Sequence, residues 1–341
     1  MEGEAVTAEL LARARAGDGE AFRELTEPHR RELHVHCYRM LGSLQDAEDA
    51  LQEILLAAWQ GLAGFKEHAS IRTWLYRVAT NRCLDALRAA RRRPSTEAAM
   101  PGVTPPEPTR LSEVVWLEPY PDALFEQGIQ PPLGPEASYE QTEAMSLAFL
   151  TALQTLPARQ RAVLILRDVL GYRAAETAEV LDATLDSVNS ALKRARATLE
   201  RRTSPAVGRQ PPPSPGSASE EHIARQLVRA YKSGDVDALV ALLTDDVRVA
   251  MPPMPLEYEG IEVAERFHRT VSFREGRSYD LVPTRANGQL AFGAYLRDSI
   301  DGIRHAMGLL VFTLAGDRVC AITRFDNSVL PWFGLPRSLP G

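Results

Sequence analysis

Two proline-rich stretches interrupt this chain and limit which of its segments can pack into a core. Ten prolines fall in the 42 residues from Pro94 to Pro135, and five fall in the 16 residues from Thr203 to Ala218. Proline has a fixed φ and no backbone N–H, so neither stretch is suited to a packed helix or a central strand. A chain of 341 residues is long enough for two or three cores. The sequence therefore predicts three folded parts joined by linkers at 94–137 and 203–218.

The first part, residues 7–93, has the apolar spacing of helices throughout, and we place these helices at 21–41, 44–61 and 71–93. In the middle helix, apolar residues recur every three or four positions and form one stripe. The stripe consists of Ala47, Ala50, Leu51, Ile54, Leu55, Ala58 and Trp59. The opposite face carries Asp46, Glu48, Asp49, Gln52 and Glu53. This face is either solvated or offers its carboxylates to a basic partner.

The second part, residues 138–202, ends in two helices whose spacing is typical of a helix-turn-helix. The first runs from Ala174 to Leu181, and its small Ala178 permits close approach of the second, which begins after the N-cap Thr184. The packed face of the second helix consists of Val188, Ala191, Leu192, Ala195 and Leu199. Its other face carries Asn189, Ser190, Lys193, Arg194 and Arg201. A polar and basic face on such a helix is free to read duplex DNA.

The third part, residues 219–330, changes from helical spacing to strict alternation. Apolar residues alternate with their neighbours at 290–296, 307–311 and 319–325, which predicts strands. We expect two or three helices first, then strands near 247–251 and 256–259, a helix at 261–271, and long antiparallel strands with a turn at 315–317. The predicted fold class is therefore multidomain: two all-α modules are followed by an α+β domain and a tail at 331–341.

Charge is distributed unevenly along the chain. The net charge of −6 argues against a uniformly basic coat for nucleic acid. Residues 65–93 nevertheless carry eight Lys and Arg against two carboxylates, whereas residues 97–147 carry nine carboxylates against one Arg. Any contact with DNA must therefore come from local basic patches.

Cysteine spacing and hydropathy favour an intracellular protein. Cys37, Cys83 and Cys320 are scattered, which disfavours a disulfide framework or a zinc site. No apolar run reaches the roughly 18 residues of a membrane span, and the N-terminus lacks the pattern of a secretion signal. We expect a cytoplasmic protein with no metal, no cofactor and no membrane contact.

Three motifs in a fixed order identify a family. They are YRMLGSLQDAEDALQEILLAAW from Tyr38, FKEHASIRTWLYRVATNRCLDALR from Phe65, and LPARQRAVLILRDVLGYRAAETAEVL followed by SVNSALKRARATL from Leu156. The chain resembles an extracytoplasmic-function (ECF) sigma factor of the sigma-70 family, in the subgroup with a C-terminal SnoaL-like extension. The likeness covers residues 18–93 and 138–202, and the stretches TRANGQLAFGAYL and WFGLP are also similar to that subgroup.

The resemblance implies partners and site residues. In this family, region 2 binds the clamp of core RNA polymerase and melts the minus-ten promoter element, while region 4 reads the minus-thirty-five element. Clamp binding falls to the acidic face of the middle helix, which comprises Asp46, Glu48, Asp49, Gln52 and Glu53. The implied minus-ten contacts are Lys66, His68, Ser70, Arg72, Trp74, Asn81 and Arg82. The implied minus-thirty-five contacts are Asp186, Ser187, Asn189, Ser190, Lys193 and Arg194. Trp74 is either a platform for an unstacked base or part of the core.

The first linker is long enough to join two separated DNA contacts. Its 42 residues extend to roughly 140 Å at about 3.3 Å per residue. Promoter elements roughly 23 base pairs apart lie about 80 Å from each other at about 3.4 Å per pair. Regions 2 and 4 can therefore read one promoter together.

The resemblance also implies a cone-shaped C-terminal fold that encloses a pocket. Candidate pocket residues are Met251, Met254, Tyr258, His268, Tyr295, His305 and Arg324. An enzyme of this fold needs a general base in its cavity, and the sequence does not place one. We therefore expect no catalysis. A regulatory domain is predicted instead, which with its tail, including Trp332 and Phe333, contacts regions 2 and 4 or their linker.

Two other functions remain open at this point. One is a one-component transcription regulator with a helix-turn-helix and a ligand pocket, which leaves the acidic helix face unexplained and would not bind core polymerase. The other is a SnoaL-like enzyme fused to a DNA-binding arm, which requires a carboxylate or histidine deep in the pocket.

Overall fold

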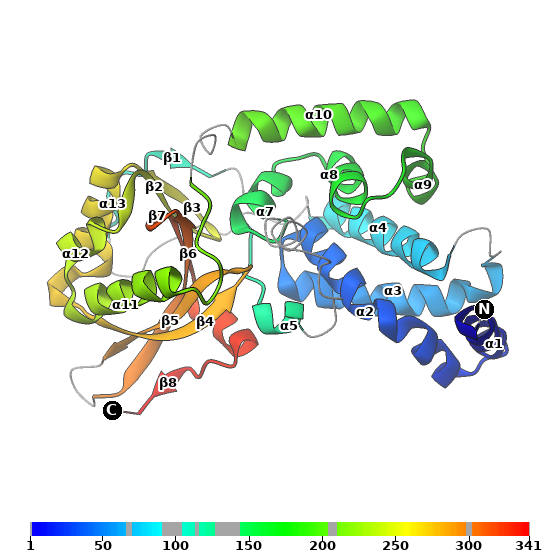
Figure 1. Ribbon diagram of the computed structural model, residues 1–341, viewed down its shortest axis with the longest axis horizontal. Helices are drawn as coiled ribbons and strands as arrows, with labels where there is room; N and C mark the ends of the chain where they lie inside the picture. Colours follow the sequence, from blue (N-terminus) through cyan, green and yellow to red (C-terminus); the bar gives the residue numbers. More distant parts are fainter. Residues whose placement is uncertain are drawn as a thin grey trace. The chain divides into compact units, whose positions relative to one another are not determined.

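The structure is a computed structural model and describes residues 2–65, 70–90, 104–112, 116–126, 144–203, 210–297 and 302–340. The chain forms two compact units, which are coloured along the sequence in Figure 1. Unit 1 comprises residues 1–94, 128–144 and 148–204, and unit 2 comprises residues 95–127, 145–147 and 205–341. Both helical modules thus lie in unit 1, whereas the α+β domain lies in unit 2 with part of the first linker.

The N-terminal half of unit 1 is a helical bundle. It contains α1 (Glu2–Arg15), α2 (Gly19–Leu41), α3 (Leu44–Gly61), the 3-10 turn η1 (Leu62–Gly64) and α4 (Ile71–Ala90). The helices expected at 21–41 and 44–61 are confirmed, and the third is confirmed as far as Ala90. Residues 91–93 lie outside the described residues. Most of the apolar stripe of α3 is buried, as its spacing predicts, whereas Leu55 and Trp59 are partly exposed.

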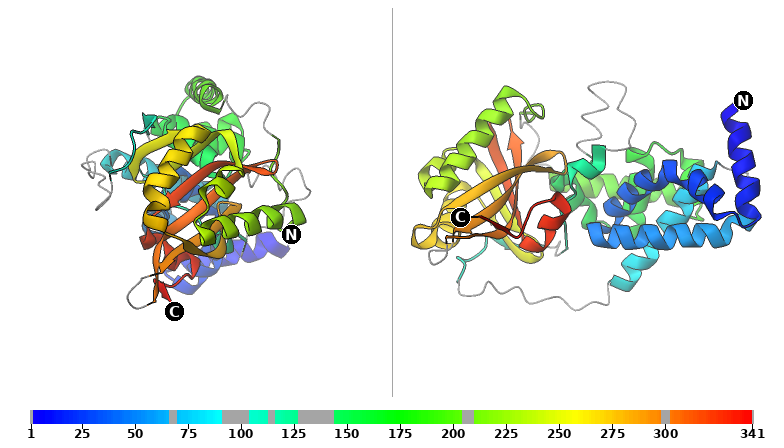
Figure 2. Two further views of the ribbon diagram at one scale, coloured as in Figure 1. Left: turned by 90° about the vertical axis from the view of Figure 1, so that its left-hand side faces the viewer. Right: turned by 90° about the horizontal axis from the view of Figure 1, so that it is seen from below.

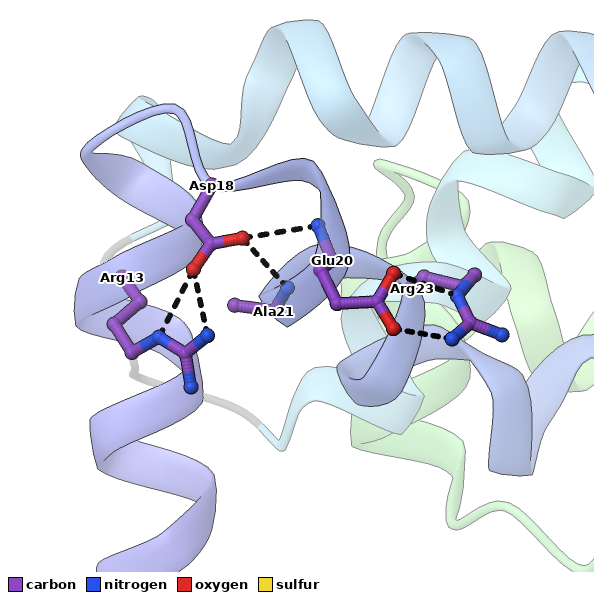
Figure 3. Close-up of polar contacts among 5 residues, drawn as sticks. All are labelled: Arg13, Asp18, Glu20, Ala21 and Arg23. Carbon is purple, nitrogen blue, oxygen red and sulfur yellow. Dashed lines mark hydrogen bonds and ion pairs between the residues drawn. The ribbon is translucent and has the colours of Figure 1, made fainter.

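A capped turn separates α1 from α2. The Asp18 carboxylate accepts hydrogen bonds from the backbone N–H groups of Glu20 (3.0 Å) and Ala21 (3.1 Å), which would otherwise have no partner in the first turn of α2 (Figure 3). Its other oxygen accepts from the Arg13 guanidinium at 3.0 and 2.7 Å. The acceptor role therefore lowers the pKa of Asp18, with the backbone of Ala21 as the largest cause.

The C-terminal half of unit 1 holds the second helical module. It consists of α7 (Leu147–Gln154), α8 (Ala158–Leu164), the π-helical turn η2 (Ile165–Val169), α9 (Ala174–Val180) and α10 (Leu185–Thr203). Gly171 has φ of +71° and ends the η2 segment, as expected for glycine after a helix. Of the helical stretch expected from residue 138, positions 138–143 lie outside the described residues, and α7 begins at Leu147.

Unit 2 is built on one mixed sheet. The strands are β1 (Arg110–Leu111), β2 (Leu243–Met251), β3 (Met254–Glu259), β4 (Tyr279–Ala286), β5 (Gln289–Arg297), β6 (Arg304–Ala315), β7 (Arg318–Phe325) and β8 (Ser338–Leu339). Their order is β1-β3-β2-β7-β6-β5-β4, with β8 beside β6. All neighbours are antiparallel except β2 and β7. The expected turn at 315–317 joins β6 to β7.

Helices lie across one face of this sheet (Figures 1 and 2). They are α11 (Ala218–Ser233), α12 (Val236–Val240) and α13 (Ile261–Phe267), and α13 continues as the π-helical turn η4 (His268–Ser272), with the 3-10 turn η5 (Arg274–Gly276) after it. Apolar residues of all three helices and of β2 to β7 form one core. The helix predicted at 261–271 is therefore confirmed, although its last part is π-helical.

The structure corrects one expectation in this domain. Alternation at 290–296 predicted one buried face, but six consecutive residues of β5, Leu290–Tyr295, are buried. The helices account for one face, and the other is covered by the 3-10 segment η6 (Asn327–Phe333) and the residues after it, since the Tyr295 hydroxyl donates to the Pro336 carbonyl at 2.8 Å. Because both faces of β5 are covered, small or apolar residues are favoured on both sides of this strand.

Candidate nucleic-acid interface

The exposed face of α10 is shaped by a cap and by an apolar stripe. The Thr184 hydroxyl accepts from the Ser187 N–H at 3.2 Å and fixes the start of the helix. Val188, Ala191, Leu192 and Ala195 are buried. The six residues predicted to contact the minus-thirty-five element are all exposed, namely Asp186, Ser187, Asn189, Ser190, Lys193 and Arg194. The structure thus brings this predicted set together on one accessible helix face.

The helix that precedes α10 is held by local polar contacts. The Glu176 carboxylate accepts from the Arg173 backbone N–H at 2.6 Å, and the buried Thr177 hydroxyl donates to the Arg173 carbonyl at 3.0 Å. The turn to α10 uses Asp182 with φ of +47°. Further along α10, Arg196 forms a bidentate pair with Asp168 at 2.9 and 2.6 Å. These contacts orient α10 on the rest of its module.

The acidic face of α3 divides into two parts. Asp49, Gln52 and Glu53 are exposed, and one turn later Leu56 is 58% exposed. Asp46 is partly buried in the first turn, which is capped by the Ser43 hydroxyl at 3.0 Å. Glu48 instead turns toward α2, where it lies 3.9 Å from Arg30 and 3.6 Å from His34. A partner helix would therefore meet three polar residues and one leucine.

The predicted minus-ten residues occupy different environments. Lys66 and His68 lie outside the described residues. Ser70 caps α4, because its hydroxyl accepts from the Thr73 N–H at 3.1 Å. Asn81 and Arg82 are exposed on α4, and so is Arg77 one turn earlier.

Trp74 belongs to a small apolar cluster rather than to an open surface. Its ring lies 5.2 Å from that of Phe65, and both pack near Leu11 of α1. The Arg15 guanidinium donates to the Phe65 carbonyl. The first helix of the chain therefore supports Phe65 and Trp74.

Arg72 links the two helical modules within unit 1. Its guanidinium pairs with Glu32 at 2.8 Å and lies 5.0 Å from the ring centroid of Tyr76 and 5.9 Å from that of Tyr172. Burial raises the pKa of Glu32, but hydrogen bonds from His29 and Arg72 outweigh it and lower the pKa overall. The rings of Tyr76 and Tyr172 meet edge to face at 5.7 Å. Arg72 is thus already engaged on three sides.

Arg161 provides a second link between the modules. This buried guanidinium donates to the Gln154 side chain (2.5 Å), to the Gln154 carbonyl (2.9 Å) and to the Met40 carbonyl of α2. The Gln154 amide in turn donates to the Arg39 carbonyl at 3.4 Å. The end of α2 is therefore held to α8 by side-chain donors on backbone carbonyls. Neither Arg161 nor Tyr172 was predicted as a functional residue, since nothing in the local spacing marks a contact so distant in sequence.

The candidate pocket residues do not form one group. Met251 and Tyr258 are buried in the main core, and His268 is buried nearby with Nδ1 at 3.1 Å from the Ser272 hydroxyl. Met254 packs at the edge of that core, and Arg324 donates to the Met307 carbonyl at 2.7 Å. Tyr295 contacts the C-terminal tail, and His305 is exposed opposite Ser338 of β8. Burial lowers the pKa of His268 to about 4.

Two sequence families match the helical modules. Residues 25–93 match Sigma-70 region 2, and residues 146–199 match Sigma-70, region 4. Over 329 residues the chain is 40% identical to the ECF RNA polymerase sigma factor SigG of Mycobacterium tuberculosis (strain ATCC 25618 / H37Rv), which covers 95% of this chain and 86% of SigG. The chain belongs to the ECF sigma factors. The predicted family is thereby confirmed.

A second sequence relative and a solved structure extend the comparison of this ECF sigma factor with its family. SigM of the same M. tuberculosis strain is 33% identical over 194 residues, which cover 57% of this chain and 83% of SigM. The crystal structure of the M. tuberculosis ECF sigma factor SigJ matches with 25% identity and a TM-score of 0.57, over 90% of this chain and 97% of SigJ. The predicted order, two helical modules and then a SnoaL-like α+β domain, is confirmed.

The described residues contain no helix that is both long and apolar enough to cross a bilayer. Among the same residues, no three or more His, Cys, Asp or Glu side chains gather as metal ligands would.

Proposed function

We propose that this ECF sigma factor contacts core RNA polymerase through α3 and reads the minus-thirty-five element through α10. As a member of its family it binds core polymerase and directs it to promoter DNA, while the polymerase performs the phosphoryl chemistry. The observation that carries the proposal is the exposed face of α10, where six polar or charged side chains lie along the first three turns after a capped start. N-terminal residues of a recognition helix reach base edges, and basic residues further along suit phosphates or guanine. The cytoplasm is the compartment in which these partners meet.

For region 2 we propose that Asn81 and Arg82 approach the unwound minus-ten strand, with Ser70 at the start of the same helix. Their exposure on α4 supports this role. Arg72 is proposed to contact DNA only after it leaves Glu32 and the two tyrosine rings. Trp74 is proposed to act as a support for Phe65, because both lie in one apolar cluster with α1.

For the C-terminal domain we propose regulation rather than catalysis. His268 is buried with a strongly lowered pKa, and burial alone accounts for the shift, so no neighbouring carboxylate prepares it as a base. The candidate pocket residues are also divided between the core, the tail and the surface. Regulation is supported by the linker residues that unit 2 contains.

The decisive experiment is run-off transcription with purified core polymerase on a promoter library. The full chain and a chain truncated after Thr203 are compared, with Lys193→Ala as the variant that weakens DNA contact. We expect transcripts that depend on both proteins and a changed promoter profile on truncation. Identical activity and compactness of the two chains would remove the regulatory role, whereas failure to bind core polymerase would refute the function itself and favour a one-component regulator.

A further inference from the structure

One end of the core of unit 2 holds a guanidinium that forms no ion pair with any described carboxylate. Arg324 lies near the end of β7, two residues after the core residue Ile322, and is mostly buried. Its guanidinium donates to the Met307 carbonyl at 2.7 Å, and the described residues give it no further hydrogen bond. Burial lowers the pKa of Arg324, because its charged form has lost much of its water.

Tyr231 of α11 places a second buried polar group close to Arg324. Tyr231 is 3% exposed, and its ring packs against those of Phe273 at 5.2 Å and Tyr279 at 6.2 Å. Among the hydrogen bonds of the described residues, none involves the Tyr231 hydroxyl. Burial raises the pKa of this phenol, and the Arg324 charge offsets only part of the shift. The hydroxyl therefore keeps its proton and can act as a donor.

The charges around these two groups are mainly positive. Burial raises the pKa of the neighbouring Tyr279 phenol, and three guanidinium groups act against that shift. They belong to Arg277, Arg324 and Arg274. One carboxylate, that of Asp326, acts on Arg324, but it is exposed and caps η6 instead of forming an ion pair with the guanidinium. The site is therefore rich in hydrogen-bond donors and in positive charge.

A buried guanidinium with a single hydrogen bond is costly, because its charge and its five N–H donors all need partners. A buried phenol without a partner adds to this cost. One bound anion satisfies both groups at once. We propose that Arg324 and Tyr231 form a binding site for a small organic carboxylate. Of the seven candidate pocket residues, this site uses only Arg324. The inference goes beyond the proposed function, because it needs neither polymerase nor promoter DNA.

The side chains of the site favour a carboxylate that is attached to an apolar body. The planar guanidinium of Arg324 presents two parallel N–H groups, which match the two oxygens of a carboxylate. The Tyr231 hydroxyl supplies a further donor. The rings of Tyr231, Phe273 and Tyr279 meet at centroid distances of 5.2, 6.0 and 6.2 Å and offer an apolar surface to the rest of the molecule. An inorganic anion gains the charge contact but not the ring contacts.

Calorimetric titration of the full chain with three probes tests the class of ligand. The probes are benzoate, benzyl alcohol, which keeps the ring but lacks the charge, and inorganic phosphate, which keeps the charge but lacks the ring. At constant ionic strength we expect benzoate to bind at least about tenfold more tightly than either of the others. Absence of benzoate binding would overturn the proposal, and so would equally tight binding of benzyl alcohol or phosphate.

Two substitutions then test the site itself. Tyr231→Phe keeps the packed ring and removes the hydroxyl, and it should weaken benzoate binding by about two- to tenfold. Arg324→Met removes the charge and should weaken binding by about ten- to a hundredfold. Arg229→Met is the matched control, because Arg229 is exposed on α11 of the same domain, and it should bind benzoate like wild type. Wild-type affinity in both site variants would show that benzoate binds elsewhere and that the assignment is wrong.

Thermal unfolding without benzoate separates a binding role of Arg324 from a structural one. Replacing a buried unpaired charge by an apolar side chain is neutral or stabilising, so Arg324→Met should unfold at the wild-type temperature or above it. Benzoate should raise the unfolding temperature of wild type and of Arg229→Met, but not that of Arg324→Met. If Arg324→Met unfolds at a lower temperature while Tyr231→Phe binds benzoate like wild type, Arg324 is a structural residue and the proposal fails. Run-off transcription without benzoate reports on the proposed function separately.

Discussion

Substitution of Tyr172 tests whether its aromatic contacts hold regions 2 and 4 together in the free protein. We call the arrangement with this contact closed and the arrangement without it open. Its ring packs edge to face on Tyr76 at 5.7 Å, and the Arg72 guanidinium lies 5.9 Å from its centroid. Tyr172→Leu keeps an apolar side chain at this buried position but removes both aromatic contacts. An aromatic pair contributes about 0.5–1.5 kcal/mol and a cation near a ring about 0.5–1 kcal/mol. We therefore expect the substitution to weaken the closed arrangement by about 1–2.5 kcal/mol.

This loss changes the ratio of closed to open molecules by about five- to seventyfold, since about 1.4 kcal/mol corresponds to a factor of ten. The distance between the modules reports the change in the free protein. Fluorophores attached through Leu56→Cys on α3 and Glu200→Cys on α10 are suitable, because both positions are exposed. The three native cysteines are buried and should label slowly.

A matched control separates opening from partial unfolding. Val188→Ala removes buried volume from α10 without touching region 2, so it should lower the stability of region 4 and leave the distance distribution unchanged. Tyr172→Leu should broaden that distribution and speed association with core polymerase. If Tyr172→Leu and Val188→Ala give the same distances, the aromatic contact does not hold the modules together and the reasoning is wrong.

Three further predictions concern the N-cap of α10, the acidic face of α3 and the buried His268. Thr184→Ala should destabilise region 4 by about 1 kcal/mol in thermal melts, because α10 loses its N-cap bond, and Thr184→Ser should restore it. Asp49→Lys and Glu53→Lys should each weaken core polymerase binding by at least about tenfold in titrations, whereas Glu48→Lys, which faces α2, should lower stability more than affinity. The lowered pKa of His268 means that the fold prefers the neutral ring, so this stabilisation is present above the unfolded value of about 6.5 and is lost as pH falls toward about 4. Chemical denaturation should give a lower free energy of unfolding at pH 5 than at pH 7.5. The difference between the two pH values should be smaller in His268→Gln.

The sequence predicts the helices and the α10 face well because their signals are local. Apolar residues at three- and four-residue spacing place Val188 and Ala195 inside, and the residues between them must then face outward. A hydroxyl before the first turn marks the cap at Thr184. Each inference needs only a few neighbouring residues, so tertiary context cannot easily reverse it.

The sequence does not predict where the linker binds, because these contacts join residues that are far apart in the chain and leave no local signal. Ten prolines disfavour a long helix or a central strand, but they leave open a short helix such as α5 (Asp122–Glu126), a short edge strand such as Arg110–Leu111 or a single bridge at Pro121. The Asn-Gly pair at 287–288 predicts a tight turn, whereas its amide bonds to Tyr120 and Met145 join residues more than 140 positions apart. Spacing carries no information about such pairs.

The connections made by Arg161 and by Asn287 each depend on a side-chain donor that binds a backbone carbonyl. Such a bond suits a protein whose parts must separate. Arg161 donates to the Met40 carbonyl, and Asn287 donates to the Met145 carbonyl. A side-chain donor on a backbone carbonyl fixes geometry while it lasts, and water restores both partners once it opens. Large apolar interfaces would instead resist separation, because each residue exposed on opening adds to the cost. We therefore expect each of these two connections to open when a single substitution removes its side-chain donor.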